Sequence, residues 1–242
     1  MIAVCIFTFS RDAMPLRECV RSVLLAECIP VICDDARNPL PGWMRGWLNH
    51  HGIDYRQTEW PRRGNLHGTD VAAGICDEMA DAAERHGTGN AMKLDSDTIL
   101  IEPAWFAGNT CFTSILQLQR DAYGCSYALE PSAARKVAKH LRQTHPQPNP
   151  KAPEDLTIWR TMAQLGIPHF VHEFDPDEGP FCAAPVGADP SDNCRRFGAI
   201  TFGNEPEGGW TDRPLQTASE MRRFVNWLEA HPATTYLSND LR

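Results

Sequence analysis

Apolar positions in the first hundred residues follow two alternating patterns, one typical of strands and one typical of helices. Short runs rich in apolar and β-branched residues predict buried strands. These runs lie at residues 2–9, 30–33, 53–56 and 91–94. Between them, apolar residues recur every three or four positions, which predicts amphipathic helices. The helices are expected at residues 15–26, 43–48 and 68–85.

The second half of the chain continues this alternation less regularly. Further strands are expected at residues 111–118, 124–129 and 167–174. Further helices are expected at residues 131–144, 154–165 and 219–230. Two segments rich in proline, glycine or aspartate have no periodicity and predict surface loops. They are residues 145–153, a candidate for a mobile loop, and residues 175–193.

Alternating strands and helices favour an α/β protein whose central sheet is mostly parallel and is flanked by helices. The chain of 242 residues is long enough for one such domain with a small appendage. We expect residues 1–175 to form the core. Residues 176–242 are expected to form a loop-rich extension and a helix that packs on the same domain.

Composition and charge exclude several classes of protein. The chain is 42% hydrophobic and 22% charged, as in ordinary globular proteins, and its formal net charge is −8. A nucleic-acid-binding face is normally basic, so no nucleic acid is expected as a partner. Apolar runs all fall short of the ~20 residues that span a bilayer, so no transmembrane segment is expected.

Cysteine usage points to a reducing environment. The nine cysteines are an odd number, and no C-x-x-C pair is present. Several of them lie in apolar periodic segments, where a free cysteine behaves as a small hydrophobic residue. The first residues are expected to form a strand and not a signal peptide. Together these features predict a cytoplasmic protein.

The segment Lys93-Leu94-Asp95-Ser96-Asp97 carries the clearest chemical signal. It follows an apolar strand, and residues i and i+2 of an extended chain project to the same side. Asp95 and Asp97 are therefore expected to converge at the end of the strand. Paired carboxylates suit Mg²⁺ or Mn²⁺ shared with phosphate oxygens. An ordinary turn is the alternative, because aspartate and serine favour turns.

The order of elements resembles the A-type (GT-A) glycosyltransferases, whose Rossmann-like sheet binds a sugar nucleotide and carries a D-x-D signature after a central strand. Asp95-Ser96-Asp97 resembles that signature. The segment Gly124–Leu129, followed by a helix and Glu154-Asp155, is similar to a second motif of β1,3-galactosyltransferase-like members. The resemblance covers about residues 1–175 in architecture. It implies a single Rossmann-like GT-A domain.

Site residues follow from this resemblance. It implies Asp97 as a metal ligand, Asp95 as a ligand or ribose contact, and His172 as a third ligand. Asp155 would be the catalytic base, with Glu154 beside it as the second catalytic candidate. The residues implied for nucleotide binding are Ser10, Arg11, Asp34, Asp35, Arg63 and Asp95.

Several of these residues also have purely structural explanations. Asp34 and Asp35 are suited to ribose hydroxyls but equally to a turn. Acidic residues such as Glu154 and Asp155 at a helix start are stabilised by the helix dipole alone. A histidine such as His172 is found in many strands without any ligand role.

The implied activity is transfer of a sugar from a nucleoside-diphosphate sugar, with a UDP-sugar favoured, to a hydroxyl of an unidentified acceptor, expected to be a glycan. Mn²⁺ or Mg²⁺ would stabilise the departing diphosphate. One alternative is a non-catalytic binding or assembly module with the same fold. Another is a phosphatase of the haloacid dehalogenase type, although Thr98 directly follows Asp97 here and Ile99 occupies the position at which that family has Thr or Val.

Overall fold

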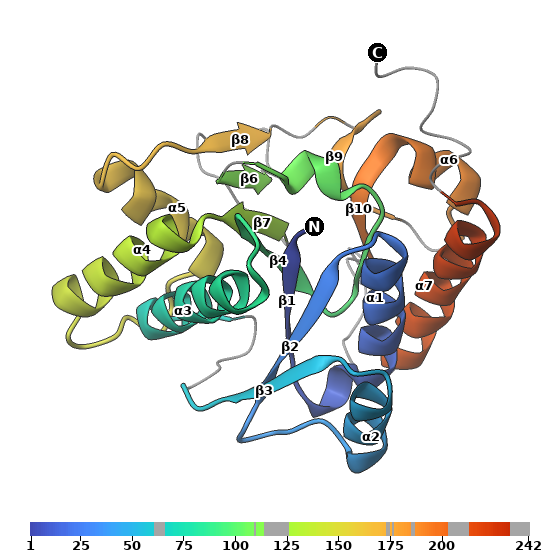
Figure 1. Cartoon of the computed structure of the whole chain (residues 1–242), viewed down its shortest axis with the longest axis horizontal. Coiled ribbons are helices and arrows are strands. Elements are labelled where there is room, and N and C mark those ends of the chain that lie inside the picture. Colours follow the sequence, from blue (N-terminus) through green and yellow to red (C-terminus); the bar gives the residue numbers. More distant parts are fainter. Residues whose placement is uncertain are drawn as a thin grey trace.

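The computed structural model has three layers, with helices on both faces of a central sheet (Figure 1). It describes residues 1–60, 66–108, 110–113, 126–172, 175, 177–184, 187–202 and 213–232. The central sheet has seven strands in the order β3-β2-β1-β4-β7-β6-β8. Their bounds are β1 Ala3–Thr8, β2 Ile29–Asp35, β3 Asp54–Thr58, β4 Ala91–Asp95, β6 Cys111–Thr113, β7 Ser126–Leu129 and β8 Phe170–His172.

The sheet is mixed but mostly parallel, so the predicted fold class is confirmed. Strands β1, β2, β3 and β4 are parallel to one another, and β8 is parallel to β6. Only β7 is antiparallel to its neighbours β4 and β6. The carboxyl ends of the parallel strands therefore lie along one edge, where α/β proteins usually bind ligands.

Seven helices are described, and five of them cover the two faces of this sheet. On one face lie α1 (Ala13–Leu25) and α2 (Gly42–His50), and on the other α3 (Thr69–His86), α4 (Pro131–Thr144) and α5 (Glu154–Gln164) (Figure 1). Strand β1 is buried throughout and sends alternate side chains into the two cores. Its hydrophobic run is thus explained by helices on both sides.

The C-terminal part adds a second sheet that the hydrophobic pattern did not reveal. Strand β10 (Phe197–Thr201) lies between β5 (Thr98–Leu100) and β9 (Gly179–Ala183). The prediction of a loop over 175–193 was wrong, because β9 and the start of α6 (Pro190–Arg196) fall within it. Asp189 caps α6 by accepting a hydrogen bond from the Ser191 amide at 2.9 Å. The Asp-Pro pair is a recognisable helix start, whereas β9 depends on pairing with β10.

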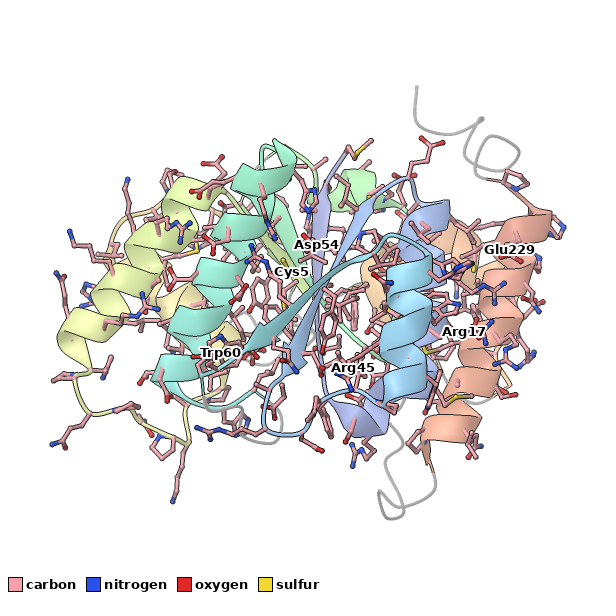
Figure 2. All side chains as sticks on the ribbon, turned by 60° about the horizontal axis from the view of Figure 1, so that its bottom comes forward. Cys5, Arg17, Arg45, Asp54, Trp60 and Glu229 are labelled. Atoms are coloured by element: carbon pink, nitrogen blue, oxygen red, sulfur yellow. The ribbon has the colours of Figure 1, made fainter. Side chains whose placement is uncertain are left out.

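Helix α7 (Arg213–Ala230) packs against α1 through a buried carboxylate. Glu18 on α1 is almost completely buried and accepts hydrogen bonds from Arg21 at 2.5 Å and from Arg222 of α7 at 3.0 Å. Arg21 also bonds Glu229 at 2.6 Å, and Figure 2 shows Glu229 on the outer helix beside α1. The predicted C-terminal helix is therefore confirmed, and ionic contacts join it to the first helix of the chain.

None of the eight cysteines within the described ranges forms a disulfide, and all eight are buried. Among the described helices, none is both long and apolar enough to cross a membrane. The predicted strand over 111–118 is described only as far as Thr113, and the strand over 124–129 only from Ser126. Both described portions are β-strands, as expected.

Helix α3 approaches the sheet closely at Gly74, where the Trp60 indole lies against the backbone. A Cβ atom at Gly74 would lie 2.7 Å from that ring. We expect Gly74→Ala to lower the free energy of unfolding by about 1–3 kcal/mol, because the rigid ring must move. The measurement is urea denaturation.

The matched control for this prediction is Gly46→Ala in α2, where no atom lies within 4 Å of the added carbon. Alanine there should raise the free energy of unfolding by about 0.5–1 kcal/mol, because it favours the helical backbone. Equal effects of the two substitutions would show that helix propensity, and not contact with Trp60, governs Gly74.

Candidate active site

Three of the predicted site segments meet at the carboxyl edge of the sheet. Phe7 of β1 is opposite Asp95 of β4, and Thr8 of β1 is opposite Asp34 of β2. The loop after β1 begins immediately beyond this register, with Ser10 and the 3-10 helix Ser10–Asp12. The order of the strands thus brings together residues that are up to about ninety positions apart in the sequence.

The D-x-D segment forms a tight turn directly after β4, which is the alternative that the sequence left open. Strand β4 ends at Asp95, and β5 begins at Thr98. The turn is held by a hydrogen bond from Ser96 Oγ to Asp12 Oδ2 at 3.0 Å. It is also held by the Phe202 amide, which donates to the Asp97 carbonyl at 2.9 Å. After the turn, β5 leaves the central sheet and pairs with β10 in the second sheet.

The carboxylates in this turn repel one another. Burial raises the pKa of Asp97, and the negative charges of Asp95 and Asp12 raise it further. Crowded carboxylates favour either a proton or a bound cation, because both relieve the repulsion. The turn therefore has the electrostatic character of a cation site.

Lys93 joins the D-x-D turn to the acidic pair at the start of α5. The lysine is 2% exposed, and its Nζ lies 2.6 Å from Asp95 Oδ1 and 3.2 Å from Glu154 Oε1. The Tyr127 ring lies beneath the ammonium group, with its centroid 5.8 Å from Nζ. A buried charge needs such partners. Lys93 thus fixes Asp95 relative to α5.

Glu154 and Asp155 are adjacent but have different environments. Glu154 is 5% exposed and faces Lys93, whereas Asp155 is partly exposed and its Oδ1 accepts from the Leu156 amide at 2.6 Å. Burial raises the pKa of Glu154 to about 7, although the positive charge of Lys93 opposes the rise. Of the two residues, only Asp155 is partly exposed.

The raised pKa of Glu154 predicts a pH dependence of stability. Between the ordinary pKa of 4.5 and the folded value of about 7, the folded protein holds a proton that the unfolded chain has lost. The contribution of Glu154 to the free energy of unfolding should therefore fall by up to about 3 kcal/mol as the pH rises through this window, and should level off above it. Asp97, whose pKa is also raised to about 7, adds its own fall in the same window. Urea denaturation from pH 5 to pH 8 measures this change.

In Glu154→Gln this part of the pH dependence should disappear, because the amide does not titrate. The exposed Glu27→Gln is the matched control and should keep the wild-type slope. A wild-type slope in Glu154→Gln would mean that Glu154 does not carry the proton.

Asp34 and Asp35 both hold the loop that follows β2. The Asp34 carboxylate accepts from the Leu40 amide at 2.9 Å and from the Tyr55 hydroxyl at 2.6 Å. Burial raises the pKa of Asp34, and these hydrogen bonds partly oppose the rise. Asp35 accepts from the Arg37 amide at 3.0 Å, as in an Asx-turn. Both residues lie at the carboxyl edge but already have structural partners.

The loop after β1 contributes one hydroxyl and one exposed cation. Ser10 Oγ donates to the Asn38 side chain at 2.7 Å, which joins this loop to the one after β2. The Arg11 side chain is 52% exposed and lies over the Phe9 ring. Its Nε lies 3.9 Å from Asp12 Oδ1, and the exposed guanidinium can also contact an anionic ligand at this edge.

His172 lies at the end of β8, the outermost strand of the sheet. Its Nε2 is 3.2 Å from the Trp105 carbonyl, and its ring packs edge-on against Trp105 and Phe170. Burial lowers its pKa, so the neutral form that a metal requires is favoured. Two strands, β7 and β6, separate β8 from β4 in the sheet order. Arg63 lies outside the described residues.

Two residues of this site were not selected from the sequence. Lys93 was taken as part of the apolar strand, but a lysine inside such a run is itself a signal, since buried lysine needs a charged partner. Asp12 is the second such residue. It does occupy the N-cap position of α1, but its side chain makes no capping hydrogen bond and accepts from Ser96 instead.

A divalent metal fits the chemistry of the D-x-D residues. Mg²⁺ commonly uses one or two carboxylates and takes its remaining ligands from water and substrate phosphates. Asp95 and Asp97 supply such carboxylates, and a cation would relieve the repulsion that raises the pKa of Asp97. Within the described ranges, no three His, Cys, Asp or Glu side chains are grouped to hold a metal. The phosphates of a substrate would therefore have to complete the site.

Comparison with known proteins identifies the fold but no sequence family. No family model matches the chain, and no curated protein matches its sequence. An active-site variant of LgtC aligns with a TM-score of 0.57 and 12% identity, over 93% of this chain and 96% of that chain. The galactosyltransferase LgtC in complex with donor and acceptor sugar analogues aligns with a TM-score of 0.55 and 11% identity over the same shares.

The glycosyltransferase GlyE of Streptococcus pneumoniae TIGR4 aligns with a TM-score of 0.53 and 8% identity, over 99% of this chain and 66% of that chain. At such low identities, a structural likeness establishes the fold and leaves the activity to be argued from the site. The chain has the fold of the A-type glycosyltransferases.

Proposed function

We propose that this protein is a metal-dependent glycosyltransferase that moves a sugar from a nucleoside-diphosphate sugar to an acceptor hydroxyl. The observation that carries the proposal is the crowding of Asp95 and Asp97 at the carboxyl edge of a glycosyltransferase fold. Breaking the anomeric bond leaves negative charge on the departing diphosphate. A divalent cation held by these aspartates would stabilise that charge.

The residues around the turn would orient Asp95 and bind the nucleotide. Lys93 holds Asp95 in place, so the aspartate is already oriented before the donor binds. Ser10 and Arg11, which follow β1, and Asp35, at the end of β2, lie at the same edge and would contact the nucleotide. Arg63 remains a candidate for the diphosphate from the sequence alone.

Asp155 is the better candidate for the base that accepts the acceptor's proton. Asp155 is partly exposed at the start of α5, whereas Glu154 is buried against Lys93. A general base must reach the substrate hydroxyl. The role applies to an inverting reaction, in which the acceptor oxygen attacks the anomeric carbon directly.

We propose a UDP-sugar as the donor and a glycan as the acceptor. The support is the likeness to LgtC, a galactosyltransferase solved with donor and acceptor sugar analogues. A second candidate, a binding module that has kept the fold without catalysis, would retain the same outline.

Thermal unfolding with a panel of nucleoside diphosphates, each with and without Mn²⁺, tests the proposal. Stabilisation by one nucleotide that requires Mn²⁺, together with turnover of the corresponding nucleotide sugar, is the expected result. Stabilisation without turnover on any sugar would favour the binding module. If no nucleotide shifts the Tm under either condition, the proposed function is wrong.

A further inference from the structure

A groove of about 830 Å³ lies on the side of the molecule that bears α4 and the segment leading into β8 (Figure 1). It is lined by Glu130, which follows β7, and β7 ends opposite Ala91, the first residue of β4. The groove is therefore at the edge of the sheet opposite to Asp97. It is separate from the proposed donor site.

One wall of the groove is a basic face of α4. Lys136, Lys139, His140 and Gln143 line it, and their spacing of three or four residues places them on one side of the helix. Both lysines are exposed, and within the described residues neither forms an ion pair. The wall thus presents two unpaired ammonium groups.

The other basic residues of α4 have partners elsewhere. Arg135 and Arg142 point to α3, where they pair with carboxylates of that helix, namely Asp77, Asp81 and Glu84. The helix therefore uses its arginines for packing within the protein and leaves its two lysines to the groove. In a chain of net charge −8, this local positive potential is distinctive.

A second part of the lining is apolar apart from His169 and includes an exposed aromatic ring. It consists of residues 165–170, in which Leu165 is 37% and Phe170 57% exposed. Pro168 and Ile167 extend the apolar surface between them. An aromatic face suits the C–H face of a pyranose ring.

We propose that this groove binds an anionic oligosaccharide. The lysines would contact its acidic groups, while Phe170 and the neighbouring apolar residues would contact its ring faces. The volume of the groove lies within the range typical of pockets that bind small organic ligands, so the groove can hold more than a single small ion. A concave groove can hold a soluble oligosaccharide. A bilayer is bound instead by side chains that protrude from the protein surface. Binding here does not depend on the proposed transferase activity.

The test is calorimetric titration with a galacturonic acid hexamer, compared with a neutral glucose hexamer. The acidic hexamer should bind, more weakly as salt increases, and the neutral one should not bind measurably. Lys136→Glu/Lys139→Glu should lower the affinity at least about tenfold, which corresponds to about 1.4 kcal/mol. Phe170→Ala should lower it as well, through loss of the ring contact.

Single substitutions provide the matched control. Lys139→Glu should weaken binding, whereas Lys151→Glu, an exposed lysine outside the groove lining, should not. Absence of binding, equal binding of the neutral hexamer, or unchanged affinity in the double variant would each overturn the proposal. Binding only to vesicles that contain anionic lipid would overturn it in favour of a membrane surface.

Discussion

Asp97→Ala is expected to abolish the Mn²⁺-dependent stabilisation of this protein by its nucleotide. A ligand at a hundred times its Kd stabilises a protein by about 2.7 kcal/mol, which for a chain of this size raises the Tm by about 5–10 °C. Without the Asp97 carboxylate the metal loses a ligand, and the nucleotide loses the cation. Differential scanning fluorimetry with and without Mn²⁺ measures the change.

Sugar transfer by the same variant should fall at least about a hundredfold, because stabilisation of the diphosphate by a metal is worth several kcal/mol and each 1.36 kcal/mol is tenfold in rate. The Asp97→Ala variant should fold normally, since removing the Asp97 carboxylate relieves its repulsion from Asp95 and Asp12. Asp192→Asn, in the exposed helix α6, is the matched control. A variant that keeps both the Mn²⁺-dependent shift and the activity would exclude Asp97 as a ligand.

Lys93→Met should be the most destabilising substitution at this site. It removes the partner of two carboxylates, Asp95 and Glu154, one of which is buried. Breaking a buried ion pair from one side typically costs about 3–5 kcal/mol, because the remaining charge is left without compensation. Urea denaturation at pH 8, where both carboxylates are ionised when unfolded, measures the loss.

Two further variants separate this electrostatic effect from packing. Glu154→Gln in the Lys93→Met background should recover part of the lost free energy of unfolding, because it removes the uncompensated charge. Lys93→Arg keeps the charge and should lose less than Lys93→Met. Strictly additive effects of Lys93→Met and Glu154→Gln would show that the two residues do not interact energetically.

Most elements of the central sheet were predictable because each has its own periodicity. The run from Ala3 to Thr8 and the helix from Ala13 to Leu25 are visible from hydrophobic pattern alone. The short strands β5, β9 and β10 are different, since each is held by its neighbour in a sheet whose members are far apart in sequence. Local pattern contains no information about such pairing.

The candidate site likewise has residues that the sequence identified and contacts that only the structure shows. Asp95 and Asp97 were identifiable because an apolar strand leads into them, and Glu154-Asp155 because they resemble the second motif of the family. The assignment of distinct roles to Glu154 and Asp155 required the position of Lys93, which no local pattern relates to α5. The contacts of Asp34 with Tyr55 and Leu40 likewise depend on the packing of separate segments.

By itself the sequence determined an acidic α/β protein with a D-x-D segment after a central strand, because period and residue type are local properties. Only the tertiary structure decided that Asp12 approaches this turn, that Lys93 links Asp95 to Glu154, and that His172 lies on the outermost strand. Those relations arise from strand order and helix packing. They join residues separated by tens of positions, and only the folded chain brings such residues into contact.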